Sequence, residues 1–270
     1  MTELQTHLLV IMKWFHELCE KENLKYFAIG GTALGAVRHN GFIPWDDDLD
    51  VGMPRKDYER LKGLSCKINQ QSDFILEFPD NKKDFVYPYG KIYDTRTTLV
   101  ESTRYKTKRG IFIDVFPIDG VGNTFEEGIE TFKKVDRKVN LLCTRICALR
   151  KSRSLYKNAA IILSRCVPDF LLGSLKLIKD IDKLCKEKDY DESAYVANYC
   201  GNWHEKEIIK KEWVENPVLC KFEDIQIYIP EDADAYLKRV YGDYMKLPPE
   251  EKRVTHHDFL YLDLNKSYLE

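Results

Sequence analysis

The sequence predicts an α+β protein, in which helices flank a mixed β-sheet core and a mostly helical C-terminal part follows. Two observations carry this prediction. In the first 122 residues, short apolar segments of strand length alternate with segments in which apolar residues recur every three or four positions. Beyond Asp119-Gly120 the spacing of apolar residues becomes mainly helical. We therefore expect a core over residues 1–122 and a helical part over residues 123–270 that packs on it.

The predicted core begins with a helix. Apolar residues from Leu4 to Cys19 follow helical spacing, so we expect an amphipathic helix that ends near Asn23. A short buried strand over residues 26–29 follows, and Gly30-Gly31 ends it. The other core elements are expected in the order helix 32–38, strand 49–53, helix 56–64 and strands 74–78, 89–93, 98–101 and 110–116.

The C-terminal part carries helical patterns over residues 124–149 and 155–188, and the second is broken near Pro168. Residues 219–222 and 225–229 resemble the strands of a hairpin that turns at Glu223-Asp224. A further helix is expected over residues 232–241, and a loop over residues 246–249.

Composition excludes several classes of protein. A net charge of −2 is unlike that of a general nucleic-acid-binding protein, which is usually strongly basic. The eight cysteines are scattered without a Cys-x-x-Cys pair, which predicts reduced thiols and no structural zinc. The N-terminus lacks the apolar stretch of a signal peptide, and no run approaches the ~20 apolar residues of a membrane span. We therefore expect a cytoplasmic protein without a nucleic-acid partner.

Four carboxylates lie within five residues, in the segment Asp46-Asp47-Asp48-Leu49-Asp50. They repel one another, and a divalent cation such as Mg²⁺ or Mn²⁺, which prefers oxygen ligands, would relieve that repulsion. In an extended strand, Asp46, Asp48 and Asp50 share one face and Asp47 faces away. A solvated acidic loop is the alternative, but apolar residues bracket the cluster on both sides. An EF-hand loop fails, because Val51 and Asp57 replace its required glycine and glutamate.

Upstream, Gly30-Gly31 lies between a predicted strand and a predicted helix. A helix N-terminus without side chains is a natural seat for phosphate, and Thr32 adds a hydroxyl there. Arg38 and His39 follow, and they would either contact phosphate oxygens or only cap the helix at the surface. A Gly-Gly turn alone is also a common structural feature, so the carboxylate cluster downstream is what makes the combination informative.

The residues from Gly30 to Arg55 carry a recognisable signature, GGTALGAVRHNGFIPWDDDLDVGMPR. This segment resembles the LicD family of phosphocholine transferases, which is related to the fukutin-like sugar-phosphate transferases. Weaker similarity continues through residues 87–94 and 110–117 and at Pro248-Pro249 and His256-His257. The spacing from Gly-Gly to Asp-x-Asp is longer than in the wider nucleotidyltransferase superfamily, as in the LicD subgroup.

The resemblance implies a nucleotidyltransferase-like mixed sheet, a CDP-choline donor and a hydroxyl acceptor on a lipid-linked glycan of the teichoic-acid or lipopolysaccharide type. It implies catalytic and metal-binding roles for Asp48 and Asp50, with Asp46 as a further ligand. Asp114 fits the third strand carboxylate, as a metal ligand or as the acceptor of the hydroxyl proton. Its alternative is a buried ion pair with Arg104 or Arg109.

Further candidates accompany these carboxylates. Lys91 is a candidate to stabilise the leaving phosphate, and His256 and His257 are candidates to orient phosphate or supply a proton. The quaternary ammonium of choline calls for an aromatic box. Its candidates are Trp45, Tyr87, Tyr89, Tyr199 and Trp203.

Two other functions stay open from the sequence: transfer of a nucleotidyl or sugar-phosphate group on the same metal site, and a non-catalytic module that binds a nucleotide or glycan. The role of the basic stretch over residues 133–176 is open too. It carries eleven Lys or Arg against Asp136 and Asp169. Contact with the inner face of an anionic membrane, a solvated basic face and a dimer interface all fit it.

Overall fold

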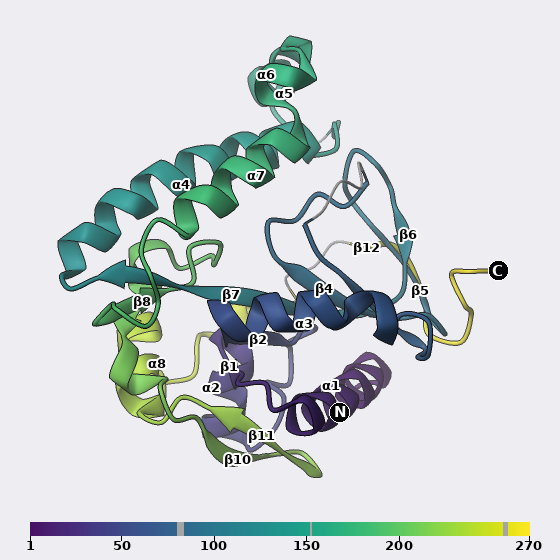
Figure 1. Ribbon diagram of the computed structural model, residues 1–270. Helices are drawn as coiled ribbons and strands as arrows, with labels where there is room; N and C mark the ends of the chain where they lie inside the picture. The colour runs from purple at the N-terminus through teal and green to yellow at the C-terminus, as the bar shows by residue number, and fades with distance from the viewer. Residues whose placement is uncertain (80–83, 152, 256–258) are drawn as a thin grey trace.

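A mixed β-sheet forms the centre of the computed structural model, which describes residues 1–79, 84–151, 153–255 and 259–270 (Figure 1). Its main strands lie in the order β1-β2-β7-β4-β3. They are β1 (Phe27–Ala28), β2 (Asp50–Pro54), β7 (Phe112–Gly122), β4 (Gly90–Asp94) and β3 (Phe74–Glu77). β2 and β7 pair in parallel, whereas β1 with β2, β4 with β7 and β3 with β4 pair antiparallel. The predicted α+β class is confirmed.

Helices cover this sheet on opposite sides. In Figure 1, α4 (Phe125–Ile146) and α7 (Ser174–Cys185) lie above β7, whereas α1 (Glu3–Glu22) and α2 (Gly30–His39) lie below it. The remaining helices are α3 (Arg55–Ile68), α5 (Leu155–Cys166), α6 (Asp169–Leu172) and α8 (Ala233–Tyr241). None of the helices within the described ranges combines the length and the apolar character that crossing a bilayer requires.

Local sequence explains where the first helix begins and ends. The side chain of Thr2 accepts a hydrogen bond from the Gln5 backbone, and the Gln5 side chain accepts one from the Thr2 backbone, which forms a capping box. Asn23 adopts the left-handed conformation and ends the helix where the sequence predicts it. The apolar face between these caps, with Leu8, Met12 and Phe15, is buried in the main core.

A second, smaller core lies between α4, α7 and the strands beneath them. Phe132 and Val135 of α4 pack in it with Leu177 and Ile181 of α7, and Val121 at the end of β7 joins them. The regularly spaced apolar residues that predicted these two helices are therefore the residues that pack between them.

The chain beyond α7 returns to the sheet, which the sequence does not predict. β8 (Tyr195–Ala197) pairs with β7 and with β9 (Ile208–Lys210). In a separate three-stranded sheet, β12 (Phe259–Asp263) pairs with β5 (Thr98–Glu101), which also pairs with β6 (Lys108–Arg109). Among the described residues, the helices α4 to α7 lie between Phe125 and Cys185, and short strands and α8 follow them. Strands of two or three residues are too short to show alternation in a sequence.

The predicted hairpin and final helix are present. β10 (Val218–Phe222) and β11 (Ile225–Ile229) pair antiparallel, and the hairpin packs beside β1 and α2. α8 packs on α2. Phe222 and Ile227 of the hairpin and Leu237 of α8 belong to the same core as α1, so these C-terminal elements are part of the sheet domain.

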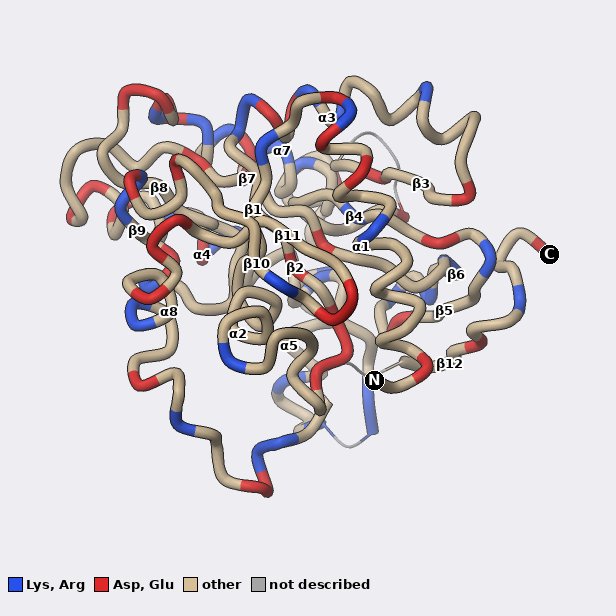
Figure 2. Tube along the Cα trace, turned by 90° about the horizontal axis from the view of Figure 1, so that it is seen from below, with Lys and Arg blue, Asp and Glu red and all other residues tan. Residues whose placement is uncertain are grey.

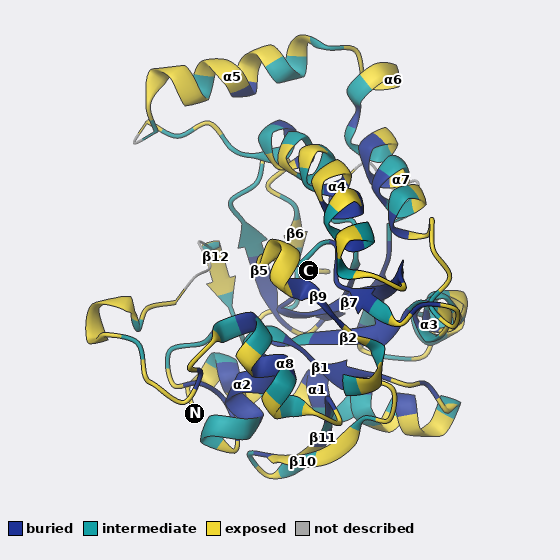
Figure 3. Cartoon of the chain, turned by 90° about the vertical axis from the view of Figure 1, so that its left-hand side faces the viewer, coloured by how far each residue is buried: buried dark blue, intermediate teal, exposed yellow. Residues whose placement is uncertain are grey.

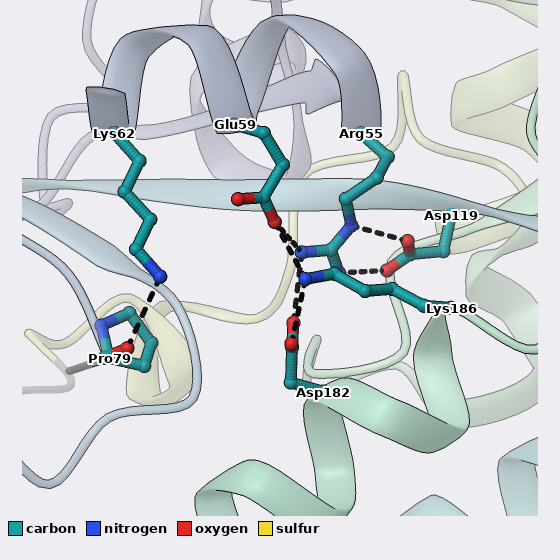
Figure 4. A network of polar contacts seen from close by, with 7 residues as sticks. All are labelled: Arg55, Glu59, Lys62, Pro79, Asp119, Asp182 and Lys186. Atoms are coloured by element: carbon teal, nitrogen blue, oxygen red, sulfur yellow. Dashed lines mark hydrogen bonds and ion pairs between the residues drawn. The ribbon is translucent and has the colours of Figure 1, made fainter. Parts of the chain in front are cut away.

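Arg55 joins the sheet to the helical layer through a network of ion pairs (Figure 4). Its Nε and Nη2 atoms each donate to one oxygen of Asp119 in β7 at 2.6 Å, and Nη1 donates to Asp182 of α7 at 3.0 Å. Lys186 Nζ lies 2.7 Å from both Asp182 and Glu59, which closes the network. Because Asp119 is buried, its charge depends on this bidentate partner.

We expect Arg55→Met to lower the free energy of unfolding by about 3–5 kcal/mol, because it leaves a buried carboxylate without its cation. Adding Asp119→Asn should recover part of that loss, since the uncompensated charge is then removed. Chemical denaturation of the single and double variants measures both effects. Arg60→Met is the control, because Arg60 is half exposed where it pairs with Asp57. If Arg55→Met and Arg60→Met lowered the free energy of unfolding equally, the network around Arg55 would contribute no more to stability than a surface ion pair.

Candidate active site

A cleft of about 660 Å³ opens beside the acid cluster. Asp46, Asp48 and Asp50 line it, together with Gly31 of α2. The opposite lining comes from residues 202–203 and from the segment 241–252, far along the chain. The cleft therefore combines the predicted acidic segment with C-terminal residues whose position only the fold determines.

Several backbone contacts hold the acidic segment in place. Gln5 of α1, which is buried, donates through Nε2 to the carbonyl oxygens of Ile43 (3.2 Å) and Asp46 (2.9 Å). The hydroxyl of Thr32 accepts a hydrogen bond from the Asp50 N–H at 2.8 Å. Thr32, the predicted phosphate ligand, thus also contacts the acidic segment through its hydroxyl. Sequence reasoning missed Gln5, because a polar residue near a chain start carries no local signal of such a role.

Both predicted glycines lie against the acid cluster, and each position disfavours a side chain for a different reason. Gly30 has a φ of +53°, which disfavours any side chain, and its N–H donates to the hydroxyl of Tyr236 at 2.9 Å. At Gly31 a Cβ atom would lie 2.6 Å from Oδ2 of Asp46, which is too close. The positive end of α2 thus faces carboxylates, and this favours their charged form.

The acids are held close enough to disturb one another. Burial raises the pKa of Asp46 to about 8, and the charges of Asp48 and Asp47 contribute. Burial also raises the pKa of Asp50 well above its usual value, and Asp48 and Asp114 add to that effect. Such carboxyl groups give up their protons readily only when a positive charge is placed among them.

Asp47 differs from the alternation prediction. It does not line the cleft, as expected for a residue that faces away, but one of its carboxylate oxygens lies within 4.8 Å of oxygens of both Asp46 and Asp48. β2 begins only at Asp50, so residues 46–48 precede the strand and do not follow its strict alternation. Three aspartates with converging oxygens are a donor set that fits a hard divalent cation.

Asp114 adds a second strand-borne carboxylate, beside Asp50, although it does not itself line the cleft. The parallel register of β2 and β7 places Asp50 opposite Asp114, and the antiparallel register of β4 places Lys91 on the other side of Asp114. Lys91 Nζ lies 2.8 Å from Oδ1 of Asp114. Burial raises the pKa of Asp114 to about 6 even though Lys91 opposes the shift. The predicted alternative partners, Arg104 and Arg109, are therefore wrong, because the strand register supplies Lys91.

Lys91 is not a residue of the cleft wall. It is buried, and its ammonium lies 3.3 Å from the ring centroid of Phe112 and 4.2 Å from that of Tyr87. The hydroxyl of Tyr87 donates to Glu101 at 2.6 Å, and Tyr89 stacks on Phe116. Lys91 thus contacts Asp114 and does not line the cleft. Tyr87 and Tyr89 lie around Lys91 and do not line the cleft either.

Cationic side chains also line the cleft. Arg38 lines it, donates to the carbonyl oxygen of Tyr244 at 2.7 Å, and donates to Nε2 of His39 at 3.0 Å. Burial lowers the pKa of His39, and Arg38 lowers it further. Lys246 and Lys252 also line the cleft, from the segment that loops outward after α8 in Figure 2. The sequence gives no pattern that connects these two lysines to the acid cluster.

The aromatic lining overlaps only in part with the predicted choline box. Trp45 and Trp203 line the cleft, and Tyr241 and Tyr244, which were not predicted, line it with them. The rings of Trp203 and Tyr241 meet edge to face with centroids 4.7 Å apart. Tyr199 is buried in the second core against Phe132, 5.0 Å between centroids, and does not line this cleft. His256 and His257 lie outside the described residues.

Comparisons with known proteins agree on one family. The family profile described as LicD/FKTN/FKRP, nucleotidyltransferase domain, matches residues 23–140. The chain is 31% identical to lipopolysaccharide cholinephosphotransferase LicD of Haemophilus influenzae over 94% of this chain and 95% of that protein. It is 36% identical over 62 residues to ribitol 5-phosphate transferase FKRP of mouse and of human. This match covers 22% of this chain and 13% and 12% of those proteins. The sheet order and flanking helices described above are therefore those of a nucleotidyltransferase-like fold.

We expect Asp46→Asn to stabilise the metal-free protein, because it removes a buried carboxylate beside two others. The native group has a pKa of about 8 and the unfolded group titrates near 4. The charge of Asp46 therefore lowers the free energy of unfolding more and more as pH rises from 4 to 8. The stabilisation by Asp46→Asn should grow over the same range. By pH 8 in EDTA, a gain of about 1 kcal/mol would raise Tm by roughly 2–4 °C.

Thermal unfolding at pH 5 and pH 8 measures this effect. Glu192→Gln is the control, since Glu192 is an exposed acid that does not line the cleft. A lower Tm for Asp46→Asn at pH 8, with the control unchanged, would mean that repulsion does not govern the cluster.

Proposed function

Because this chain belongs to the LicD/FKTN/FKRP family, we propose that it transfers phosphocholine from CDP-choline to a hydroxyl group of a cell-surface glycan precursor, of the lipopolysaccharide or teichoic-acid type. The single observation that carries the proposal is the cleft in which converging aspartates, cations and aromatic rings meet. The similarity over nearly the whole chain to a lipopolysaccharide cholinephosphotransferase supports the choice of phosphocholine.

Asp46, Asp48 and Asp50, with Asp114 beside Asp50, would hold the divalent cation, either Mg²⁺ or Mn²⁺. When bound, the cation would neutralise the carboxylates and the charge on the diphosphate oxygens. The structure supports this role because these acids lie close together and burial raises the pKa values of Asp46, Asp50 and Asp114. Gln5 and Thr32 would fix their positions before any ligand binds.

The cations of the cleft would contact the nucleotide phosphate. Arg38 is positioned by its own hydrogen bond to the Tyr244 carbonyl and presents a guanidinium that suits phosphate oxygens. Lys246 and Lys252 would add positive charge from the segment after α8. Charge is then balanced by acids on one side of the diphosphate and by cations on the other.

The aromatic rings would select the choline end. Trp203 and Tyr241 form an edge-to-face pair at the cleft, and Trp45 lies across from Arg253, whose guanidinium is 5.6 Å from the ring centroid. Ring faces attract a quaternary ammonium, which cannot be bound by hydrogen bonds. A site lined by these rings would favour choline over an uncharged alditol.

In the proposed reaction, the acceptor hydroxyl oxygen forms a bond to the choline-bearing phosphorus, and the bond from that phosphorus to CMP breaks. The hydroxyl proton passes to a carboxylate. Asp114 is the candidate acceptor, because it lies opposite Asp50 on the neighbouring strand and Lys91 holds it in place. CMP leaves with only the nucleoside-bearing phosphate, and the cationic side chains would stabilise the charge that develops on it.

A second candidate function is transfer of an alditol phosphate. The match to the two ribitol 5-phosphate transferases supports it, although that match spans only 62 residues. The two functions separate in one assay, in which purified protein is given CDP-choline or CDP-ribitol with Mg²⁺ and glycan acceptor, and CMP release is measured. Release from neither donor would favour a non-catalytic binding module.

We expect Asp48→Asn to lower the rate of CMP release from CDP-choline by at least about 100-fold, because it removes charge stabilisation at the transferred group. EDTA should abolish wild-type activity, and added Mg²⁺ or Mn²⁺ should restore it. Circular dichroism should show an unchanged fold. Val218→Ala, at an exposed site on β10, is the control. Near wild-type turnover by Asp48→Asn at saturating Mg²⁺ would contradict the assignment.

We also expect CDP-choline to raise Tm only when a divalent cation is present, because a cation bridging acids and diphosphate couples the two binding steps. The effect is measured by thermal unfolding with CDP-choline and Mg²⁺, each alone and together. Trp203→Ala should weaken the response to CDP-choline more than the response to CMP, since only CDP-choline carries the ammonium group. Equal shifts with and without EDTA would argue against the bridge.

A further inference from the structure

The helices α5 and α6 project from the ends of α4 and α7, away from the sheet (Figures 1 and 3). Most of their surface is exposed in Figure 3. They lie apart from the cleft, and none of their residues lines it. The exposed surface of α5 and α6 is therefore separate from the cleft.

α5 turns its apolar side outward. At 100° per residue, its exposed Leu, Tyr, Ile, Ala and Cys side chains fall within an arc of roughly 160°. These residues are Leu155, Tyr156, Ala159, Ala160, Ile162, Leu163 and Cys166. Leu155 is 89% exposed, Tyr156 77% and Leu163 68%. A helix that packs on a protein core would bury such residues, so this arrangement is the reverse of the usual one.

The polar side of α5 faces the protein. Asn158 donates to the carbonyl oxygen of Arg150 at 2.9 Å, and Arg165 donates to that of Cys147 at 2.5 Å. Ile161 is the buried apolar residue of the helix. These hydrogen bonds fix the rotation of α5 about its axis, so the outward apolar arc is a property of the fold.

The apolar surface continues beyond α5. Phe170 and Leu171 of α6 are 76% and 51% exposed, and Leu149, before α5, is 48% exposed. So many exposed apolar side chains on one protruding part of the protein indicate a surface that binds another apolar surface.

Positive charge surrounds this surface. From Arg137 to Pro168 the sequence has eight Lys or Arg and no Asp or Glu. Lys151, before α5, and Lys157, in the first turn of α5, are both exposed. The neighbouring segment adds the exposed Arg104, which is tied to the end of α4 by a hydrogen bond from its N–H to the Ile146 carbonyl at 2.7 Å.

We propose that α5 and α6 form a docking surface for an anionic lipid bilayer. The outward apolar arc enters the boundary between head groups and acyl chains, and Lys151 and Lys157 contact the lipid phosphates. α5 has 12 residues, which span roughly 18 Å and suit a helix that lies in the plane of the membrane.

Charge favours this occupant over a second copy of the chain. Two copies joined symmetrically through this surface would bring the same cations together, whereas an anionic bilayer neutralises them. The proposal does not depend on the reaction catalysed. It would place the enzyme where a lipid-linked acceptor lies, if the proposed function is right.

Vesicle co-sedimentation of the full chain tests the proposal. Wild-type protein should sediment with phosphatidylglycerol–phosphatidylcholine vesicles, less with pure phosphatidylcholine, and less at high salt. The double variant Leu155→Glu, Leu163→Glu should bind at least 10-fold more weakly. Because both side chains are exposed, its fold and any CMP release without vesicles should be unchanged. The matched control is Val218→Glu, Leu219→Glu, at two exposed apolar positions of β10.

A second pair of variants tests the charge. The double variant Lys151→Glu, Lys157→Glu should lose binding to anionic vesicles. The double variant Lys133→Glu, Lys134→Glu, at exposed positions in the N-terminal half of α4, should lose less. Arg150 and Arg153 are unsuitable, since both make hydrogen bonds within the protein.

Three results would overturn the proposal. They are a wild-type protein that ignores anionic vesicles at low salt, equal losses in the test and control variants, and equal binding to neutral and anionic vesicles. Analytical ultracentrifugation adds a fourth. A lipid-independent dimer that Leu155→Glu, Leu163→Glu dissociates, without vesicle binding by the wild type, would assign the surface to a second copy.

Discussion

Repulsion among aspartates at the head of β2 and β7 is the constraint on which the rest of the structure depends. Parallel pairing of these strands puts Asp50 beside Asp114, and the turn before β2 brings Asp46 and Asp48 to the same place. Buried like charges at this spacing favour protonation or separation of the strands. The fold resists separation through contacts that reach the segment from distant elements.

Those contacts come from three directions. Gln5 of α1 holds the backbone of the acidic segment, Thr32 of α2 holds the start of β2, and Lys91 of β4 balances Asp114. The N-terminus of α2 also faces the acids, and Gly31 is the residue that lets a carboxylate come so near. A site with this much support is held in position by the protein itself, as the proposed transfer reaction would require.

The helical layer and the C-terminal segment have different relations to this site. The Arg55 network fixes α7 on the sheet through Asp119 and Asp182, away from the cleft. The chain after α7 instead returns to complete the cleft, with Trp203, Tyr241 and Lys246. One scaffold therefore carries a site made largely from its two ends and, at α5, an outward apolar surface that the core does not use.

The sequence by itself determined the class of fold, most helices, the sheet strands with clear alternation and the acidic segment, because each depends on residues close together in the chain. It grouped Asp46, Asp48 and Asp50 because they are close in the chain, but it joined Asp114 to them only through a resemblance. The tertiary structure alone decided that Lys91 is the partner of Asp114, since register between strands is set by packing and has no local signal. It also decided which of many aromatic residues line the cleft and which way α5 faces, because a helical pattern reveals an apolar side but not whether that side meets the core or the solvent.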